Sequence, residues 1–254
     1  MNHTSEAVKH LLQEQLEKEN TVLAVWEGGS AATGYLDQYS DLDLLIVING
    51  SDANAIFQML ETHFENNYGI LKQFRMPEPA WHGMSQCFYL LKDCPLHFYC
   101  DIAVVCNDNP SKFTETDRHG NAVIWFDKAN IFESKKSSKE ELESIRNRAF
   151  AAATATDWLA VIELQKALSR KNWIASQMNY ITFIYRHLVP LMNLKYRPCK
   201  ADFGIRYADR DYPIEAAAFL EDLLRITCVA DIEFKLPAAL AMFEELKQTQ
   251  MPKT

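Results

Sequence analysis

Two aspartates, Asp41 and Asp43, stand two residues apart at the start of the apolar run 42–48, LDLLIVI. This run is predicted to be a strand, and the side chains of a strand alternate between its two faces, so both carboxylates are expected on one face. Like charges this close repel, and the arrangement is costly unless a cation lies there. Carboxylate oxygens suit Mg²⁺, which keeps some waters and also accepts phosphate oxygens. The pair therefore predicts a magnesium site that meets a substrate phosphate.

A turn rich in glycine, Gly28-Gly29-Ser30, follows the apolar run 22–26 and ends ten residues before Asp41. Glycines let backbone N–H groups approach a triphosphate closely, and a helix that starts after the turn adds a favourable dipole. The Ser30 hydroxyl can hydrogen-bond the terminal phosphates, while a plain helix N-cap is the structural alternative for this residue. The turn alone is weak evidence, but followed by a strand-borne Asp-Leu-Asp it predicts a nucleotide site.

The elements that position these residues follow an α/β pattern in the first half of the chain. Apolar side chains at helical spacing predict an amphipathic helix over residues 5–18 and another in the stretch that follows Gly50. Runs of apolar residues bounded by turns predict the strands. They are expected at 22–26, 42–48, 70–75, 86–91 and 96–105, with a polar, loop-like segment at 107–119.

From about residue 139 strands cease, and alternations of Ala, Leu and charged residues predict helices at 139–168, 173–194 and 213–248. The Ser/Lys-rich stretch SKKSSKE at 134–140 marks the boundary. We therefore predict two domains, 1–134 and 135–254. The predicted fold class is α/β (α+β) with a mixed sheet, followed by an all-helical C-terminal domain.

The Gly-Ser turn, the ten-residue gap and the Asp-x-Asp pair resemble the nucleotidyltransferase superfamily, which has the DNA polymerase beta-like fold. Within it, the aminoglycoside nucleotidyltransferase-like branch is the most similar. The match covers residues 20–48, and the order of elements agrees to about residue 105. The resemblance implies that residues 1–134 are the catalytic domain and residues 135–254 a helical substrate-binding domain. It also implies an ATP donor and two Mg²⁺ ions.

Carried over residue by residue, the resemblance assigns the triphosphate to the turn Gly28-Gly29-Ser30 and the metal ions to Asp41 and Asp43. It also implies a third carboxylate from a later strand, and Asp101 in HFYCDIAVV fills that position best. Ionised carboxylates are rare inside a strand without a partner or a metal. The structural alternative for Asp101 is a strand-end aspartate that caps a turn or pairs with a lysine.

Three carboxylates imply two-metal catalysis, in which one ion activates an acceptor hydroxyl and the other neutralises the leaving pyrophosphate. Related drug-modifying enzymes are expected to add a carboxylate from the helical part, and Glu163 is the candidate here, with Asp157 second. A solvated ion pair with Lys166 is the default for Glu163. Arg186 lies in a polar helical stripe and could reach a phosphate or the acceptor, although a solvent-facing stripe explains it equally well.

Composition excludes several classes of protein. The net charge of -8 disfavours a nucleic-acid partner, and with it a polymerase, because such proteins need a basic surface. No apolar run approaches the roughly 18 residues that cross a bilayer, so we expect no membrane partner and a cytoplasmic location. The six cysteines and seven histidines show no zinc-ligand spacing.

Charge is also divided unevenly along the chain, with 19 acidic and 8 basic side chains in residues 1–134 and 15 acidic and 18 basic in residues 135–254. This asymmetry is compatible with a cation-attracting first half and equally with ordinary solvated surfaces. The resemblance makes a small hydroxylated molecule, in the leading case an aminoglycoside-like antibiotic, the expected acceptor, and the protein would then be an antibiotic-resistance enzyme. An acidic first half would suit such a polycationic acceptor. Transfer to a protein side chain and a non-catalytic nucleotide sensor are the alternatives. The resemblance leaves a monomer and a homodimer open, and the segment 196–213 has no assigned role.

Overall fold

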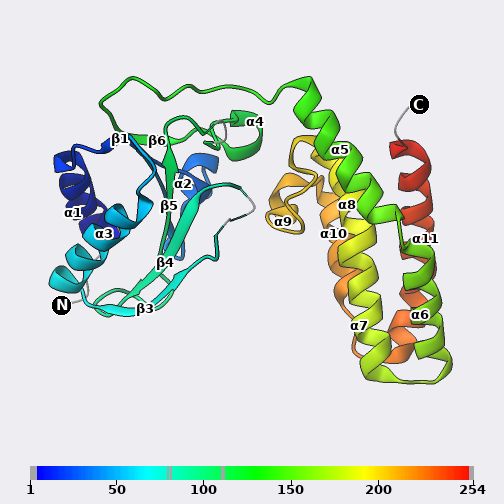
Figure 1. The fold of residues 1–254 in the computed structure, drawn as a ribbon. Coiled ribbons are helices and arrows are strands. Elements are labelled where there is room, and N and C mark those ends of the chain that lie inside the picture. Colours follow the sequence, from blue (N-terminus) through cyan, green and yellow to red (C-terminus); the bar gives the residue numbers. More distant parts are fainter. Residues whose placement is uncertain (1–4, 79, 81, 110–111, 252–254) are drawn as a thin grey trace. The chain divides into compact units, whose positions relative to one another are not determined.

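The computed structural model describes residues 5–78, 80, 82–109 and 112–251. The chain divides into two compact units, Met1–Lys136 and Ser137–Thr254 (Figure 1). The first unit contains a sheet with helices and the second unit is helical, so the predicted fold class is confirmed. Within the described residues, no helix combines the length and the apolarity needed to cross a membrane.

The first unit is built on a six-stranded mixed sheet in the order β3-β4-β5-β2-β1-β6. Its central pair, β2 (Leu42–Ile48) and β5 (Cys100–Cys106), is parallel, whereas β1 (Val22–Glu27) runs antiparallel to β2. The outer strands β3 (Ile70–Arg75), β4 (Ser85–Leu91) and β6 (Val123–Asp127) are each antiparallel to their neighbours. The sheet thus has β2 and β5 at its centre, where sequence analysis places the aspartates.

The two faces of this sheet carry different cores. On one face, α1 (Ser5–Lys18) and α3 (Ala53–Asn67) pack apolar side chains such as Leu12, Leu60 and Phe64 against β2, β4 and β5 (Figure 1). Burying one such side chain contributes roughly 1.5–3 kcal/mol. The opposite face holds a smaller cluster around Trp26 and Val47. That opposite face is also the one from which the odd-numbered residues of β2, Asp43 included, project.

Three local differences from the predictions occur in the first unit. β5 begins at Cys100 rather than at residue 96, because Pro95 starts a turn in which the Phe98 N–H donates to the Pro95 carbonyl at 2.9 Å. The predicted loop 107–119 contains the short helix α4 (Thr116–His119). β6 was not predicted, although its first four residues form the short apolar run VIWF; it is an edge strand in which Val123 and Ile124 are exposed and Trp125 and Phe126 pack against the core.

Two of the three long helices predicted for the second unit are broken. The stretch 139–168 divides into α5 (Lys139–Thr154) and α6 (Asp157–Ser169), and 213–248 into α10 (Ile214–Leu224) and α11 (Val229–Gln250). At the second break, the Asp231 carboxylate accepts the N–H groups of Thr227 and Cys228 and so starts a new helix. Helical periodicity alone does not reveal such restarts.

The third predicted helix is continuous but not uniform. It comprises α7 (Trp173–Phe183), a π-helical turn (Ile184–Leu188) and α8 (Val189–Tyr196). Pro190 has no N–H and therefore cannot donate the backbone hydrogen bond to the preceding turn of the helix. The wider π-helical turn just before it is an expected response to this missing bond. The turn contains Arg186, whose side chain is exposed, beside the buried His187.

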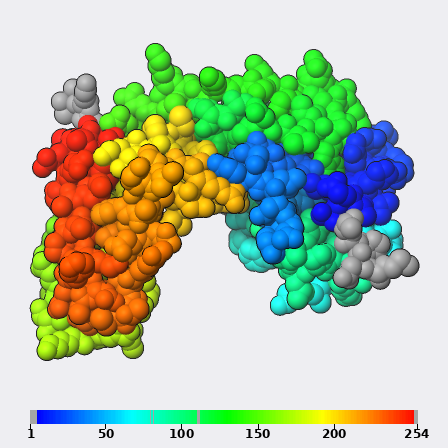
Figure 2. All heavy atoms as spheres, turned by 180° about the vertical axis from the view of Figure 1, so that it is seen from behind, coloured from blue at the N-terminus to red at the C-terminus, as the bar shows by residue number. Residues whose placement is uncertain are grey.

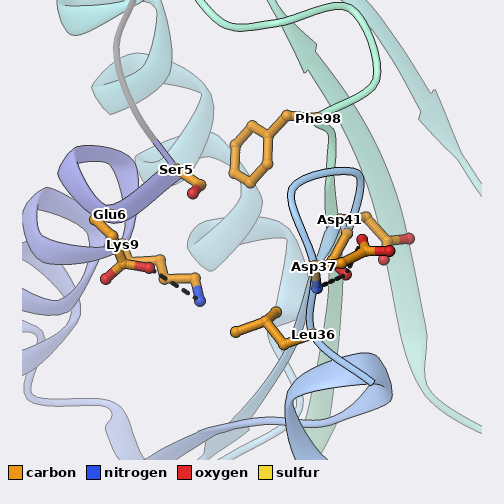
Figure 3. A pocket seen from close by; sticks show the side chains of 8 residues that line it. Ser5, Glu6, Lys9, Leu36, Asp37, Asp41 and Phe98 are labelled. Carbon is orange, nitrogen blue, oxygen red and sulfur yellow. Dashed lines mark hydrogen bonds and ion pairs between the residues drawn. The ribbon is translucent and has the colours of Figure 1, made fainter. Parts of the chain in front are cut away.

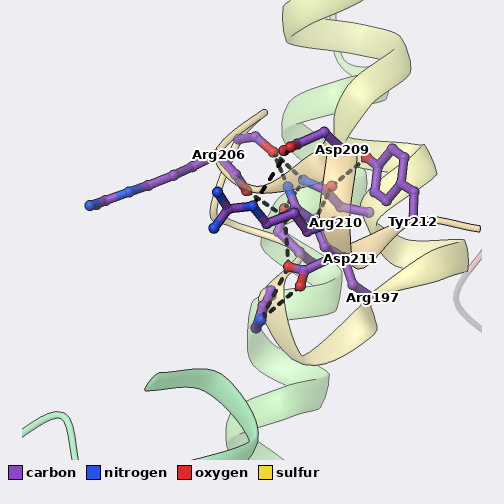
Figure 4. A network of polar contacts seen from close by, with 10 residues as sticks. Arg197, Arg206, Asp209, Arg210, Asp211 and Tyr212 are labelled. Carbon is purple, nitrogen blue, oxygen red and sulfur yellow. Dashed lines mark hydrogen bonds and ion pairs between the residues drawn. The ribbon is translucent and has the colours of Figure 1, made fainter. Parts of the chain in front are cut away.

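The segment 196–213 is an ordered structural element at the surface of the second unit (Figure 2, yellow to orange). It contains the short helices Pro198–Lys200 and α9 (Ala208–Asp211). The buried Arg197 guanidinium donates to Asn193 Oδ1, to the Gly204 and Arg206 carbonyls and to Asp211 Oδ2 (Figure 4). Its many internal contacts indicate that this segment stabilises the helical unit.

Candidate active site

Asp43 and Asp101 are brought side by side by the parallel pairing of β2 and β5, in which they are register partners. Paired residues of adjacent strands project from the same sheet face, and adjacent strands lie about 4.8 Å apart. Both side chains are half-buried. Two residues 58 positions apart in the sequence therefore form one acidic pair, which was predicted from the resemblance and could not be derived from spacing.

The glycine turn lies directly against Asp43. The Gly28 N–H donates to the Asp43 carbonyl at 2.9 Å, which ties the turn to β2. Gly29 adopts a φ of 52°, and a Cβ on it would stand only 1.6 Å from Oδ2 of Asp43. No other residue fits there without displacing the carboxylate, whereas a Cβ on Gly28 would meet nothing within 4 Å. Gly29 is thus the glycine that the site requires.

Ser30 lies inside the short helix α2 (Gly29–Thr33), and its side chain is buried. The N-cap of α2 is Gly28, so the structural alternative of Ser30 as a plain N-cap is wrong. The backbone of the turn and the Ser30 side chain remain the part of this site that we assign to phosphate.

Asp41 shares its surroundings with Tyr99, a residue that sequence analysis did not single out. Burial comes first among the causes that raise the pKa of Tyr99, followed by a hydrogen bond with Asp41 and the negative charges of Asp41, Asp43 and Asp101. One phenol therefore lies within electrostatic reach of all three carboxylates. The signal was available, because Tyr99 precedes Asp101 by two residues and alternation places both on one face.

Gln86 on β4 is a second residue that was missed. Its side-chain amide donates to Asp101 Oδ1 at 2.5 Å. It is the second residue of β4, in a run of otherwise mostly apolar residues, and an amide in such a run was the available signal. The alternative in which Asp101 pairs with a lysine receives no support from this bond, because its donor is neutral.

A pocket of about 240 Å³ opens beside Asp41 (Figure 3). Ser5, Glu6 and Lys9 of α1 face Leu36, Asp37 and Asp41 across it. The Lys9 ammonium is bound to Glu27 at 2.9 Å and also lies 3.7 Å from the Glu6 carboxylate. Carboxylates therefore predominate among the charged groups on the pocket wall, as a cationic ligand would require.

The two carboxylates that sequence analysis singled out in the second unit, Glu163 and Asp157, both form ion pairs within that unit. Glu163 is half-exposed and pairs with Lys166 at 2.7 Å, as the default interpretation of its spacing predicted. Asp157 is buried and pairs with Lys247 of α11 at 2.5 Å.

Asp41, Asp43 and Asp101 are the candidate ligands of a magnesium ion. Across the described ranges, no group of three or more His, Cys, Asp or Glu side chains is arranged to hold a metal ion. The ligand chemistry nevertheless fits Mg²⁺, which prefers hard carboxylate oxygens. Asp43 and Asp101 are neighbours in the sheet, and all three aspartates act on the phenol of Tyr99, so the three carboxylates lie near one another. Asp43 and Asp101, with Asp41 beside them, are the residues that would hold it.

Residues 8–76 match the family model of the nucleotidyltransferase domain. This span includes the glycine turn, Asp41 and Asp43 and ends before Asp101. Among solved structures, an aminoglycoside 6-adenyltransferase from Bacillus subtilis is similar at 10% sequence identity and a TM-score of 0.37, over 98% of this chain and 90% of that chain. A likeness this distant carries no weight for fold or activity. No curated protein matches the sequence.

Proposed function

We propose, from the match of residues 8–76 to the family model of the nucleotidyltransferase domain, that the protein transfers a nucleoside monophosphate, AMP from ATP in the leading case, to a hydroxyl group of a small molecule. The observation that carries the proposal is the packing of Gly29 against Asp43 while Asp101 stands beside Asp43 in the sheet. A phosphate-binding turn and an acidic pair are adjacent, which nucleotidyl transfer needs.

The glycine turn is assigned to the triphosphate. A turn without side chains lets backbone N–H groups approach phosphate oxygens, and Gly29 also leaves the Asp43 carboxylate room beside the turn. The Asp43 carbonyl holds Gly28 by a hydrogen bond, so the turn and the carboxylate are positioned by the same strand. Phosphate and carboxylate are thereby close enough to share a cation.

Asp41, Asp43 and Asp101 are assigned to magnesium. When bound, Mg²⁺ would lower the pKa of the acceptor hydroxyl and offset the charge of the departing pyrophosphate. Tyr99 is assigned to the orientation of Asp41. Burial and the neighbouring carboxylates raise the pKa of this phenol, so it stays protonated at neutral pH and donates a hydrogen bond to the Asp41 carboxylate.

The acceptor is proposed to be a polycationic, hydroxylated molecule of the aminoglycoside class. The acidic excess before residue 135 favours such a ligand, and the pocket beside Asp41 adds the carboxylates of Glu6 and Asp37. Ammonium groups of the acceptor would pair with these carboxylates, and a hydroxyl group would lie near Asp41. A neutral sugar has no ammonium groups to pair with these carboxylates, and it therefore serves as the control acceptor.

The test is an acceptor screen. The protein with ATP and Mg²⁺ is given aminoglycosides, neutral sugars of similar size, or a mixture of proteins, and pyrophosphate release is followed. Mass spectrometry then identifies the molecule that gains a nucleotide. We expect release only with aminoglycosides, and none with the Asp43→Asn variant.

Other outcomes of the screen select the alternatives. A nucleotide found on a protein side chain would replace the small-molecule acceptor by a protein. ATP binding without pyrophosphate release for any acceptor would contradict the enzyme and leave a nucleotide sensor. GTP, CTP and UTP run beside ATP identify the preferred base.

A further inference from the structure

The carboxylate of Asp101 is oriented by a neighbouring strand. Gln86 on β4 is the register partner of Ala103 on β5, so it lies diagonally across from Asp101 on the same sheet face. Its Nε2 atom donates to Asp101 Oδ1 at 2.5 Å. A carboxylate held through one oxygen can no longer rotate freely about its last bond, and its second oxygen therefore keeps one direction.

An amide can present either its oxygen or its nitrogen, and His82 decides which one faces Asp101. The Met84 N–H donates to Nδ1 of His82 at 3.1 Å, so Nδ1 carries no proton. In a neutral imidazole the proton is then on Nε2, which lies 2.9 Å from Gln86 Oε1. Nε2 donates to the amide oxygen, and the amide nitrogen is left to point at Asp101.

The backbone fixes this direction through a tight turn. Gly83, between His82 and Met84, has a φ of 73°, a conformation that favours glycine. Its N–H donates to the Ala80 carbonyl, and its own carbonyl accepts from the Asn109 side chain at 3.1 Å. The turn thus brings the Met84 N–H close to the His82 ring. The hydrogen bond from Asn109 links the turn to the segment that follows β5.

We infer that Gln86 is a positioning residue for the metal site, that it holds Asp101 in the orientation that a divalent cation requires, and that His82 sets the direction of its amide. The inference rests on the proposed function, in which Asp101 is a metal ligand. Partners that orient a metal ligand from the second layer typically change metal affinity or activity by about 10- to 100-fold when they are removed. Neither Gln86 nor His82 is expected to touch the substrate.

The test measures binding of Mn²⁺, without any transfer step, to the full chain in the presence of an ATP analogue with a methylene group between the α- and β-phosphorus atoms. Gln86→Leu is expected to raise the Kd of Mn²⁺ by about 10- to 100-fold. The matched control is Gln73→Leu on β3, an exposed glutamine, which should bind Mn²⁺ like the parent. Thermal unfolding of each variant is measured alongside, and Gln86→Met replaces Gln86→Leu if the latter does not fold.

A double variant distinguishes a relay from two separate contributions. If His82 acts only through Gln86, His82→Ala should weaken Mn²⁺ binding in the parent and have no further effect in Gln86→Leu. The ring nitrogens of His82 give an independent readout by ¹⁵N NMR, where the neutral ring should carry its proton on Nε2. A merely structural role of either residue would alter thermal unfolding and not this coupling.

Three results would overturn the inference. They are parental Mn²⁺ affinity in Gln86→Leu, an undiminished effect of His82→Ala in that background, and a neutral His82 with its proton on Nδ1. The Asp101→Asn variant separates these from a failure of the proposed function. If Asp101→Asn weakens Mn²⁺ binding and Gln86→Leu does not, only the positioning role is wrong. If Asp101→Asn also binds Mn²⁺ like the parent, the third metal ligand has been misassigned and the positioning role falls with it, while nucleotidyl transfer is still decided by the acceptor screen.

Discussion

The candidate site of the α/β unit and the helical unit hold their partly or fully buried carboxylates in different ways. In the helical unit, Asp157 is paired with Lys247 and Asp211 with both Arg197 and Lys200. In the α/β unit, Asp101 accepts a hydrogen bond from the amide of Gln86, and Asp41 shares one with the phenol of Tyr99. The two aspartates of the helical unit are matched by cationic side chains, as the buried Glu27 of the α/β unit is by Lys9. Asp41 and Asp101, in contrast, accept hydrogen bonds from neutral donors.

This difference indicates which carboxylates are available for chemistry. A carboxylate beside a lysine or arginine has its charge offset within the fold, and removing it leaves a buried cation behind. A carboxylate oriented by an amide or a phenol keeps its negative charge for an added cation. The type of donor is therefore a better guide to an available carboxylate than burial is. Burial alone would favour the buried Asp157, which is paired with Lys247, over the half-buried Asp101.

The largest expected effect is on transfer by the aspartates of the α/β unit. Asp43→Asn should lower the single-turnover rate by at least about 10³-fold, roughly 4 kcal/mol, and should also weaken triphosphate binding in Mg²⁺. Asp101→Asn should lower the rate by a similar factor and leave the nucleotide Kd nearly unchanged, since we assign it to the acceptor side. Rapid-quench kinetics and calorimetry measure the two quantities.

The control for these variants is Glu163→Gln in the helical unit. Because Glu163 is half-exposed and paired with Lys166, we expect its transfer rate to stay within about threefold of the parent's. A loss comparable to that of Asp43→Asn would contradict the comparison and restore Glu163 as a catalytic base. Parental transfer by Asp101→Asn would show that the third ligand has been misassigned.

The next effect in size is on the stability of the helical unit. Arg197→Met should lower its free energy of unfolding by about 3–5 kcal/mol, because Asp211 and several carbonyls lose a buried donor. Urea unfolding followed by circular dichroism reports this, since helices dominate that unit. Arg225→Met, which removes an exposed pair with Glu221, should cost under about 1 kcal/mol. Equal losses in the two variants would refute the assignment of 196–213 as a stabilising element.

A smaller effect separates the two glycines of the turn. Gly29→Ala must adopt a positive φ, which costs about 1–2 kcal/mol, and its Cβ must also displace the Asp43 carboxylate. We therefore expect lower stability together with weaker triphosphate binding. Gly28→Ala, which meets open space, should change either quantity by less than about 0.5 kcal/mol. Thermal unfolding and calorimetry on both variants check this, and identical behaviour would contradict the packing described for Gly29.

The smallest effect is confined to acid. Burial alone would raise the pKa of Asp211, but its hydrogen bonds and ion pairs with Lys200 and Arg197 outweigh burial and lower the pKa below 3.8. A carboxyl group whose pKa is lower in the folded state stabilises the fold. This contribution is fully present above the unfolded-state pKa of about 3.8, and it is lost as the pH falls through the folded-state pKa. The difference in unfolding free energy between the parent and Asp211→Asn should therefore shrink only below about pH 3.8. A difference that stays constant from pH 5 to pH 2 would contradict this coupling.

Much of the fold follows from local sequence. The helix at 5–18 and the strands at 22–26, 42–48, 70–75 and 86–91 are confirmed within one residue. Their signals are periodic apolar side chains bounded by turn residues, which act over a few positions. The breaks near residues 155 and 226 were missed, because periodicity continues through them and capping contacts decide where a helix restarts.

Local sequence also determined part of the candidate site. Alternation along a strand places Asp41 and Asp43 on one face, and the turn that ends β1 precedes them by a fixed interval. The pair of Glu163 and Lys166 is equally local, since three residues of a helix bring them together. Each of these depends on backbone geometry within a single element.

Only the tertiary structure decided which of these groups meet. Asp101 stands beside Asp43 because β5 pairs in parallel with β2, and Gln86 reaches Asp101 because β4 adds antiparallel to β5 in one register. A shift of one residue in either pairing would turn the side chains to the opposite face. Register depends on the burial of whole strands in a shared core, so it is a property of the assembled sheet and not of any one segment of the sequence.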